Sequence, residues 1–173
     1  MLDADGLFAF AASAAGASGG FGGLAGAEAI GALSARAAPT VLTPHAGELA
    51  RVLGLDRESI GARRLWSAAA AAAAARAVVV LKGDDTLIVD PDGLVAISSG
   101  DAPALATAGS GDVLAGMIGA YLAKRMEPFP AACAAVYLHA EAARMLAAEL
   151  GGEGIVAGDV IAALPRALAR RGV

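Results

Sequence analysis

The chain has 173 residues, a length that suits one domain, and a net charge of −4 without a basic block, which argues against nucleic acid or an anionic membrane surface as partners. It is 57% hydrophobic but only 4% aromatic, so its core must be built from Ala, Val, Leu and Ile. The single cysteine, Cys133, excludes a disulfide within the chain.

The beginning of the chain carries no targeting signal that we recognise. Residues Met1 to Asp5 are acidic where a secretory signal is basic. The uncharged stretch from Gly6 to Ala27 is interrupted by seven glycines and lacks the Leu, Ile and Val density of a membrane span. We therefore expect a cytoplasmic protein without a membrane partner.

Apolar spacing and the positions of Gly and Pro predict the elements of the first part of the chain. In order, these are helices at Leu7–Ala15 and Leu24–Ala35, a strand at Thr40–Thr43, and helices at Gly47–Leu53 and Arg57–Ala75. Asp56 is a candidate N-cap for the last helix. The alanine run Ala68–Ala75 favours a surface helix with a close-packed alanine face.

The remaining elements begin with a strand at Ala77–Leu81, whose unbroken β-branched run is typical of a sheet covered on both faces. Strands at Thr86–Asp90 and Leu94–Ser98 flank a Pro-Asp-Gly turn and predict a hairpin. Three helices follow, at Gly111–Arg125, Pro130–Leu150 and Gly158–Arg171. This order predicts an α/β sandwich formed by a single domain, residues 1–173.

The most informative stretch is the loop Ala106–Asp112, which opens the apolar helix that follows. The small residues Gly109, Ser110 and Gly111 let a backbone approach an anion closely, and the free N–H groups of a helix start then point at it. Asp112 places a carboxylate in the same turn, where it is a candidate general base. The simpler interpretation, an ordinary glycine-rich turn before a helix, stays open on the loop alone.

The sequence of this loop does not match two better-known phosphate-binding motifs. A dinucleotide fingerprint needs a third glycine where Leu114 stands. A P-loop needs Lys-Ser/Thr where Met117 and Ile118 stand.

Polar side chains also follow two predicted strands, at the end where open α/β sheets bind ligands. Thr43 ends the first strand, with His45 and Glu48 close behind it, and Lys82 with Gly83 follows the second. A lysine at such a place can meet a phosphate as a point charge. Each residue also has a structural interpretation: a loop histidine with its bonds satisfied, a first-turn carboxylate favoured by the helix dipole, and a solvated turn lysine.

Four segments together resemble the NAD(P)H-hydrate dehydratase family, in the family's order and along the whole chain. They are Thr43-Pro44-His45-x-Gly47-Glu48, Leu81-Lys82-Gly83-x-x-Thr86, Leu105-Ala106-Thr107-x-Gly109-Ser110-Gly111-Asp112, and Tyr137-Leu138-His139-Ala140-Glu141. Asp3-Ala4-Asp5 looks like a strand-end segment of the same family. The combination is highly specific, whereas Gly-x-Gly-Asp alone occurs across ribokinase-like enzymes.

The resemblance implies a ribokinase-like three-layer α/β/α sandwich and a hydro-lyase. The implied reaction is ADP- or ATP-dependent dehydration of NADHX or NADPHX to NADH or NADPH, a metabolite repair, with Mg²⁺. By position, His45 and Asp112 would contact the hydrate, with Asp112 as proton acceptor. The implied nucleotide-binding residues are Lys82, Gly83, Asp84, Asp85, Thr86 and Gly111, and no residue is assigned as a metal ligand.

Other functions are compatible with parts of this pattern. A small-molecule kinase of the same fold would phosphorylate an alcohol, although the segment around His45 argues against it. A non-catalytic nucleotide-binding remnant would bind nucleotide without turnover. A purely structural module would not require Lys82 and Asp112 to stand beside glycines.

The chain differs from the family's usual sequence at several positions, and it is shorter than the family's domains. Ala46 and Ala108 stand where Pro and Gly are frequent, and Asp101-Ala102-Pro103 replaces an Asn-Pro segment. Asp3-Ala4-Asp5 falls at the very start, so we expect a domain that lacks the family's N-terminal part. Because an uncovered parallel sheet edge promotes aggregation, we expect a homo-oligomer. An NAD(P)H-hydrate epimerase is the expected partner in the same pathway.

Overall fold

The computed structural model describes residues 1–3, 6–7 and 30–170. Most of the predicted helix Leu7–Ala15 and the first part of Leu24–Ala35 lie outside these residues. The chain divides into two compact units, unit 1 at Met1–Ile97 and unit 2 at Ser98–Val173, and each is described by itself.

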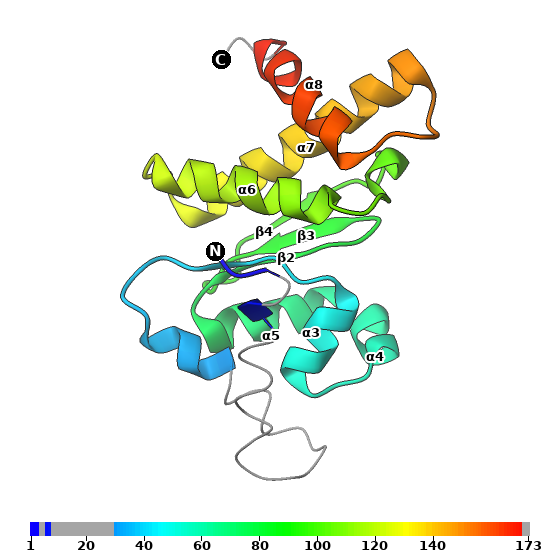
Figure 1. The fold of residues 1–173 in the computed structure, drawn as a ribbon. Helices are drawn as coiled ribbons and strands as arrows, with labels where there is room; N and C mark the ends of the chain where they lie inside the picture. The colour runs from blue at the N-terminus through cyan, green and yellow to red at the C-terminus, as the bar shows by residue number, and fades with distance from the viewer. Residues whose placement is uncertain (4–5, 8–29, 171–173) are drawn as a thin grey trace. The chain divides into compact units, whose positions relative to one another are not determined.

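Unit 1 contains a mixed four-stranded sheet in the order β1-β2-β3-β4 (Figure 1). β1 (Val41–Leu42) pairs in parallel with β2 (Val78–Leu81), which pairs antiparallel with β3 (Thr86–Val89). Leu2 forms a parallel bridge with Leu42 beyond β1. All four residues of β2 are buried, which confirms the predicted buried strand.

The predicted hairpin is confirmed as β3 and β4 (Val95–Ser98), which are neighbours in the sheet. Asp90 Oδ1 accepts hydrogen bonds from the backbone N–H groups of Asp92 at 3.0 Å and Leu94 at 2.7 Å. Gly93 completes the turn with a φ of +95°, a conformation that disfavours any side chain. The turn chemistry visible in the sequence therefore fixes this part of the sheet.

One prediction is wrong, because the structure has two helices where the sequence predicts a single continuous one. In place of Arg57–Ala75, the structure has α4 (Arg57–Ala62) and α5 (Arg64–Ala75). Arg63 interrupts them with φ −136° and ψ 44°, outside the helical region. Gly61, in the last turn of α4, weakens that helix because glycine has low helix propensity. The predicted N-cap is confirmed, since Asp56 accepts a hydrogen bond from the Ser59 N–H at 2.7 Å.

The other described helices of unit 1 are short. α3 (Ala46–Leu53) confirms the predicted helix there, and Gly54 ends it in the left-handed conformation. The predicted helix that ends at Ala35 finishes as the 3₁₀ turn η1 (Ala32–Ala35).

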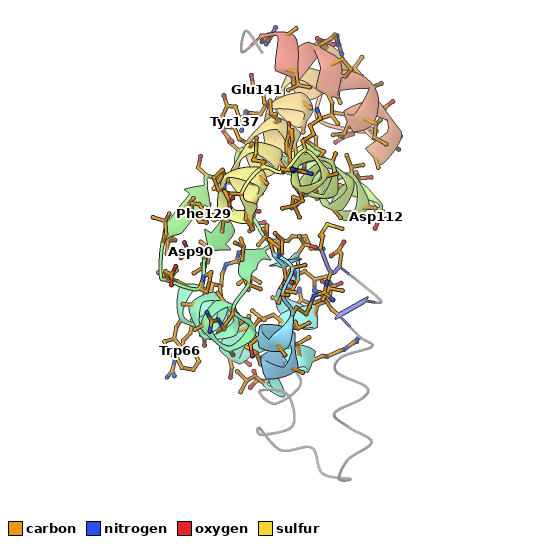
Figure 2. The ribbon with its side chains drawn as sticks, turned by 90° about the vertical axis from the view of Figure 1, so that its left-hand side faces the viewer. Trp66, Asp90, Asp112, Phe129, Tyr137 and Glu141 are labelled. Carbon is orange, nitrogen blue, oxygen red and sulfur yellow. The ribbon has the colours of Figure 1, made fainter. Side chains whose placement is uncertain are left out.

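The core of unit 1 rests on the alanine face of α5. Ala68, Ala71, Ala72 and Ala75 are each at most 1% exposed, and they belong to one apolar cluster with Leu42, Val79 and Leu81. The close-packed alanine face predicted for this helix is thus confirmed. Trp66 lies on the same helix but is 62% exposed and projects outward (Figure 2).

Unit 2 is helical. It contains α6 (Ser110–Ala123), α7 (Pro128–Leu150) and α8 (Ala157–Ala169), as the sequence predicts to within a few residues. The 3₁₀ turn η2 (Pro103–Leu105) lies where the sequence predicts a loop. Small side chains of α7 and α8, among them Ala142, Ala143 and Ala163, are fully buried in a shared cluster. None of the helices in the described part of the chain has the length and apolar character that a bilayer crossing needs.

Candidate functional site

A charged cluster lies at one edge of the sheet in unit 1. Lys82 Nζ is 3.0 Å from Asp3 Oδ1 and 3.7 Å from Glu48 Oε2. The side chains are 21%, 11% and 9% exposed, respectively, so water screens these ion pairs only in part. The cluster holds two carboxylates and one ammonium group.

The parallel strands bring this cluster together. Asp3 follows the Leu2 bridge, His45 and Glu48 follow β1, and Lys82 follows β2, so each stands at a carboxyl-terminal strand end. His45 and Lys82 form a parallel bridge, in which the Lys82 N–H donates to the Pro44 carbonyl at 2.9 Å. The strand-end placement inferred from the sequence is therefore correct for His45, Glu48 and Lys82.

His45 acts as the N-cap of α3. Its Nδ1 accepts hydrogen bonds from the N–H groups of Gly47 at 2.9 Å and Glu48 at 3.1 Å. In return, Glu48 Oε2 accepts from the His45 N–H at 2.7 Å, which completes a capping box. The structural interpretations of His45 and Glu48 are thus both realised, while the imidazole remains 58% exposed and accessible.

The loop between β2 and β3 carries the residues assigned to the nucleotide. Gly83, Asp84 and Asp85 are exposed, and Thr86 Oγ1 donates to the Gly83 carbonyl at 3.4 Å. Arg64, from α5, also donates to carbonyl groups of this loop, a contact that no sequence pattern indicates. Arg64 therefore adds a cation to this loop.

The glycine loop lies in unit 2 and begins α6. Gly109 is the N-cap with a φ of +83°, which explains the glycine there, and Ala108 does not adopt a positive φ. Ser110 Oγ donates to the Leu105 carbonyl at 2.7 Å and so ties the loop to η2. Gly111 and Asp112 stand in the first turn, where N–H groups have no partner within a helix.

Asp112 is exposed on α6 (Figure 2). No hydrogen bond or ion pair of its side chain appears among the described residues. A carboxylate in a first helical turn is favoured by the helix dipole and is accessible here to a ligand in solution.

Helix α7 holds the segment that leads into this loop. Arg144 Nη1 is 2.7 Å from Asp101 Oδ1, and Arg144 Nη2 is 3.0 Å from Glu141 Oε2. Asp101 is one of the residues at which the chain differs from the family that its sequence resembles. The sequence contains no local signal for this pair, because 43 positions separate Arg144 from Asp101.

His139, also on α7, is the second histidine of the chain and is only 5% exposed. Its Nε2 is buried without a hydrogen-bond partner among the described residues. Burial lowers the pKa of His139 from 6.5 to about 4, and a hydrogen bond with the Ser110 backbone opposes this in part. His139 is therefore neutral near pH 7.

His139 is expected to make the protein less stable as the pH falls. Since its pKa is 6.5 when unfolded and about 4 when folded, the unfolded chain binds more protons between these values. The loss is fully developed below pH 4 and reaches about 3 kcal/mol. Urea unfolding followed through Tyr121 and Tyr137, both in unit 2, measures it. His139→Leu should flatten the profile, and equal slopes for both proteins would contradict the assignment.

The structure thus assembles the predicted residues as two groups. His45 and Lys82 come together in unit 1, joined by Glu48 and by Asp3, while Gly109, Ser110, Gly111 and Asp112 form the loop of unit 2. Over residues 1–3, 6–7 and 30–170, no three His, Cys, Asp or Glu side chains group in a way that could hold a metal ion.

The described chain is an α/β protein with a charged cluster at parallel strand ends and a glycine-led helix with an acidic first turn, and its fold is ribokinase-like. A structure described as a ribokinase-like superfamily protein from Enterococcus faecalis supports this fold, with a TM-score of 0.66 at 24% identity over 97% of this chain and 51% of that one. A family model for NAD(P)H-hydrate dehydratase matches residues 1–166. The chain belongs to this family, which confirms the resemblance found in the sequence.

The names of similar proteins agree with this assignment. The ADP-dependent (S)-NAD(P)H-hydrate dehydratase of Xanthomonas campestris is 39% identical over 76% of this chain and 46% of its own length. The bifunctional NAD(P)H-hydrate repair enzyme Nnr of Moorella thermoacetica is 42% identical over 75% of this chain and 24% of its own. The ADP/ATP-dependent NAD(P)H-hydrate dehydratase of Bacillus subtilis, crystallised with ATP and Mg²⁺, superposes with a TM-score of 0.72 at 36% identity. This match covers 76% of our chain and 48% of the Bacillus chain, so our chain spans about half of that relative.

Proposed function

We propose that this chain carries out nucleotide-dependent dehydration of NADHX or NADPHX to NADH or NADPH. The observation that carries the proposal is the exposed Asp112 in the first turn of a glycine-led helix, in a chain of the NAD(P)H-hydrate dehydratase family. The names of the relatives supply the substrate, and the geometry supplies a group that can act on it.

The assigned roles follow the two groups of residues. In unit 2, the N–H groups around Gly109, Ser110 and Gly111 would bind the transferred phosphoryl group, because helix starts favour anions. In unit 1, His45 would contact the hydrate. The loop from Lys82 through Gly83, Asp84 and Asp85 to Thr86 would bind the adenine nucleotide. Gly111, in unit 2, is assigned to the nucleotide as well.

The proposed chemistry turns a poor leaving group into a good one. The ring hydroxyl attacks the terminal phosphorus of the nucleotide, Asp112 accepts the hydroxyl proton, and the bond to the nucleotide's bridging oxygen breaks. The lone pair of the ring nitrogen then expels phosphate. Loss of a proton from the neighbouring ring carbon restores the dihydropyridine, so the balance is removal of water and hydrolysis of one phosphoanhydride.

Mg²⁺ fits this site as a partner of the nucleotide. The ion keeps several waters and binds mainly phosphate oxygens, with one or two protein carboxylates. Asp84 and Asp85, exposed on the nucleotide loop, and Asp112 are the carboxylates that could serve it. When bound, the ion would offset charge on the phosphates.

The setting of the reaction is part of the proposal. We infer a cytoplasmic homo-oligomer. We also infer that it acts beside an NAD(P)H-hydrate epimerase, since several relatives are named bifunctional repair enzymes. Light scattering at micromolar concentration tests the oligomer, and a monomer would contradict it.

One assay tests the reaction. Purified protein, Mg²⁺ and either ADP or ATP are added to NADHX or NADPHX, and the return of the reduced-nicotinamide absorbance is followed. Recovery that requires a nucleotide supports the proposal, and no recovery with either nucleotide overturns it. A phosphorylated alcohol that accumulates would indicate the kinase alternative, and nucleotide binding without turnover would indicate a remnant.

A further inference from the structure

Arg64 crosses the loop between β2 and β3. It is the first residue of α5, and its Nη2 donates hydrogen bonds to the carbonyl oxygens of Leu81, at 3.4 Å, and of Asp85. These two carbonyls stand on either side of Gly83. One guanidinium group therefore joins the two ends of the loop.

Gly83 makes room for this guanidinium. A Cβ atom built on Gly83 would lie 2.5 Å from Arg64 Nη1 and 2.6 Å from Nη2, distances at which one of the two groups must move. The backbone of Gly83 does not have a positive φ, so its conformation does not require glycine. A methyl group at this position would therefore push the guanidinium, the flexible end of the Arg64 side chain, away from its two carbonyls.

We propose that Arg64 is a positioning residue that sets the conformation of the loop Lys82–Thr86 and, through it, the affinity for nucleotide. The second half of this inference rests on the proposed function, in which the loop binds nucleotide. Arginine suits the role because its planar fork presents several N–H donors in fixed directions. Lysine keeps the charge but offers one flexible ammonium group in place of the fork.

The first test concerns the loop alone and needs no nucleotide. In the wild-type background, Gly83→Ala displaces the guanidinium from its two carbonyls, so we expect the melting temperature to fall by about 2–4 °C. In the Arg64→Ala background the new methyl group meets no obstacle and restricts the unfolded chain, so the same change should be neutral or stabilising. An equal loss in both backgrounds would overturn the assignment.

The second test measures the affinity for ADP with Mg²⁺ by calorimetry. Arg64→Ala should raise the dissociation constant on the order of tenfold, because a displaced loop loses its binding geometry. Arg64→Lys should remain several-fold weaker than wild type. Arg63→Ala is the matched control: it removes the same charge from the neighbouring exposed residue and should bind like wild type.

The two tests separate the possible failures. Wild-type affinity in Arg64→Ala and Arg64→Lys would refute the role in nucleotide binding. A weakening of equal size in Arg63→Ala would refute it as well, because net charge would then explain the effect. A wild-type chain that binds no nucleotide would overturn the proposed function, and the glycine test would still decide whether Arg64 positions the loop.

Discussion

Asp112→Asn is expected to lower the rate of NADHX dehydration by about 10²–10⁴-fold, the usual contribution of a general base. The asparagine keeps the size and the hydrogen-bonding reach of the side chain but cannot accept the hydroxyl proton at neutral pH. Because the N–H groups of the Gly109–Gly111 loop are untouched, the affinity for nucleotide should change little. Single-turnover formation of NADH measures the rate, and calorimetry measures the affinity.

Asp159 offers a matched control for this substitution. It lies in the first turn of α8, where its Oδ2 accepts a hydrogen bond from the Val156 N–H at 2.9 Å. Asp159→Asn therefore makes the same chemical change at an equivalent helix position and should leave the rate near that of wild type. Near-normal turnover in Asp112→Asn, with nucleotide still bound, would show that Asp112 is not the base.

Lys82→Met is expected to lower the free energy of unfolding of unit 1 by about 2 kcal/mol. Removal of one partner from a fully buried ion pair costs roughly 3–5 kcal/mol. The smaller value applies because Lys82 is 21% exposed and solvent screens the carboxylates left behind. Urea unfolding followed by the fluorescence of Trp66, the only tryptophan of the chain, reports on unit 1.

Two further variants show whether the loss comes from the ion pairs. The double variant Lys82→Met with Asp3→Asn should lose less than the sum of the single variants, since each single change already breaks the contact of 3.0 Å. Lys124→Met, which removes the only other lysine from an exposed position, should cost little. Additive losses in the double variant would contradict a direct coupling.

The elements that the sequence predicts well are those fixed by local chemistry. The β-branched run at Val78–Leu81 and the Pro-Asp-Gly turn carry their own structural preferences, and both are confirmed. The sequence does not indicate the break at Arg63, because the break is the backbone conformation of one residue within a pattern that is helical on both sides. In this stretch, the low helix propensity of Gly61 is the one local feature that disfavours a continuous helix.

In the candidate site, too, the sequence predicts some contacts and not others. Strand-end logic places His45 and Lys82 together, because parallel strands present their carboxyl ends at one edge of a sheet. It does not reveal that Lys82 pairs with Asp3, 79 positions away, or that Arg64 covers Gly83. Such contacts depend on how separate elements pack, and no residue pattern along the chain encodes them locally.

The alanine face of α5 has a consequence for conformational entropy. A buried leucine or methionine gives up rotamers when it folds, whereas alanine has none to lose. Ala68, Ala71, Ala72 and Ala75 therefore enter the core at no cost in side-chain freedom, although each removes only a methyl group from water. The layer that supports β2, and with it Lys82, is thus ordered mainly through its backbone and has no side-chain rotamers through which to relax.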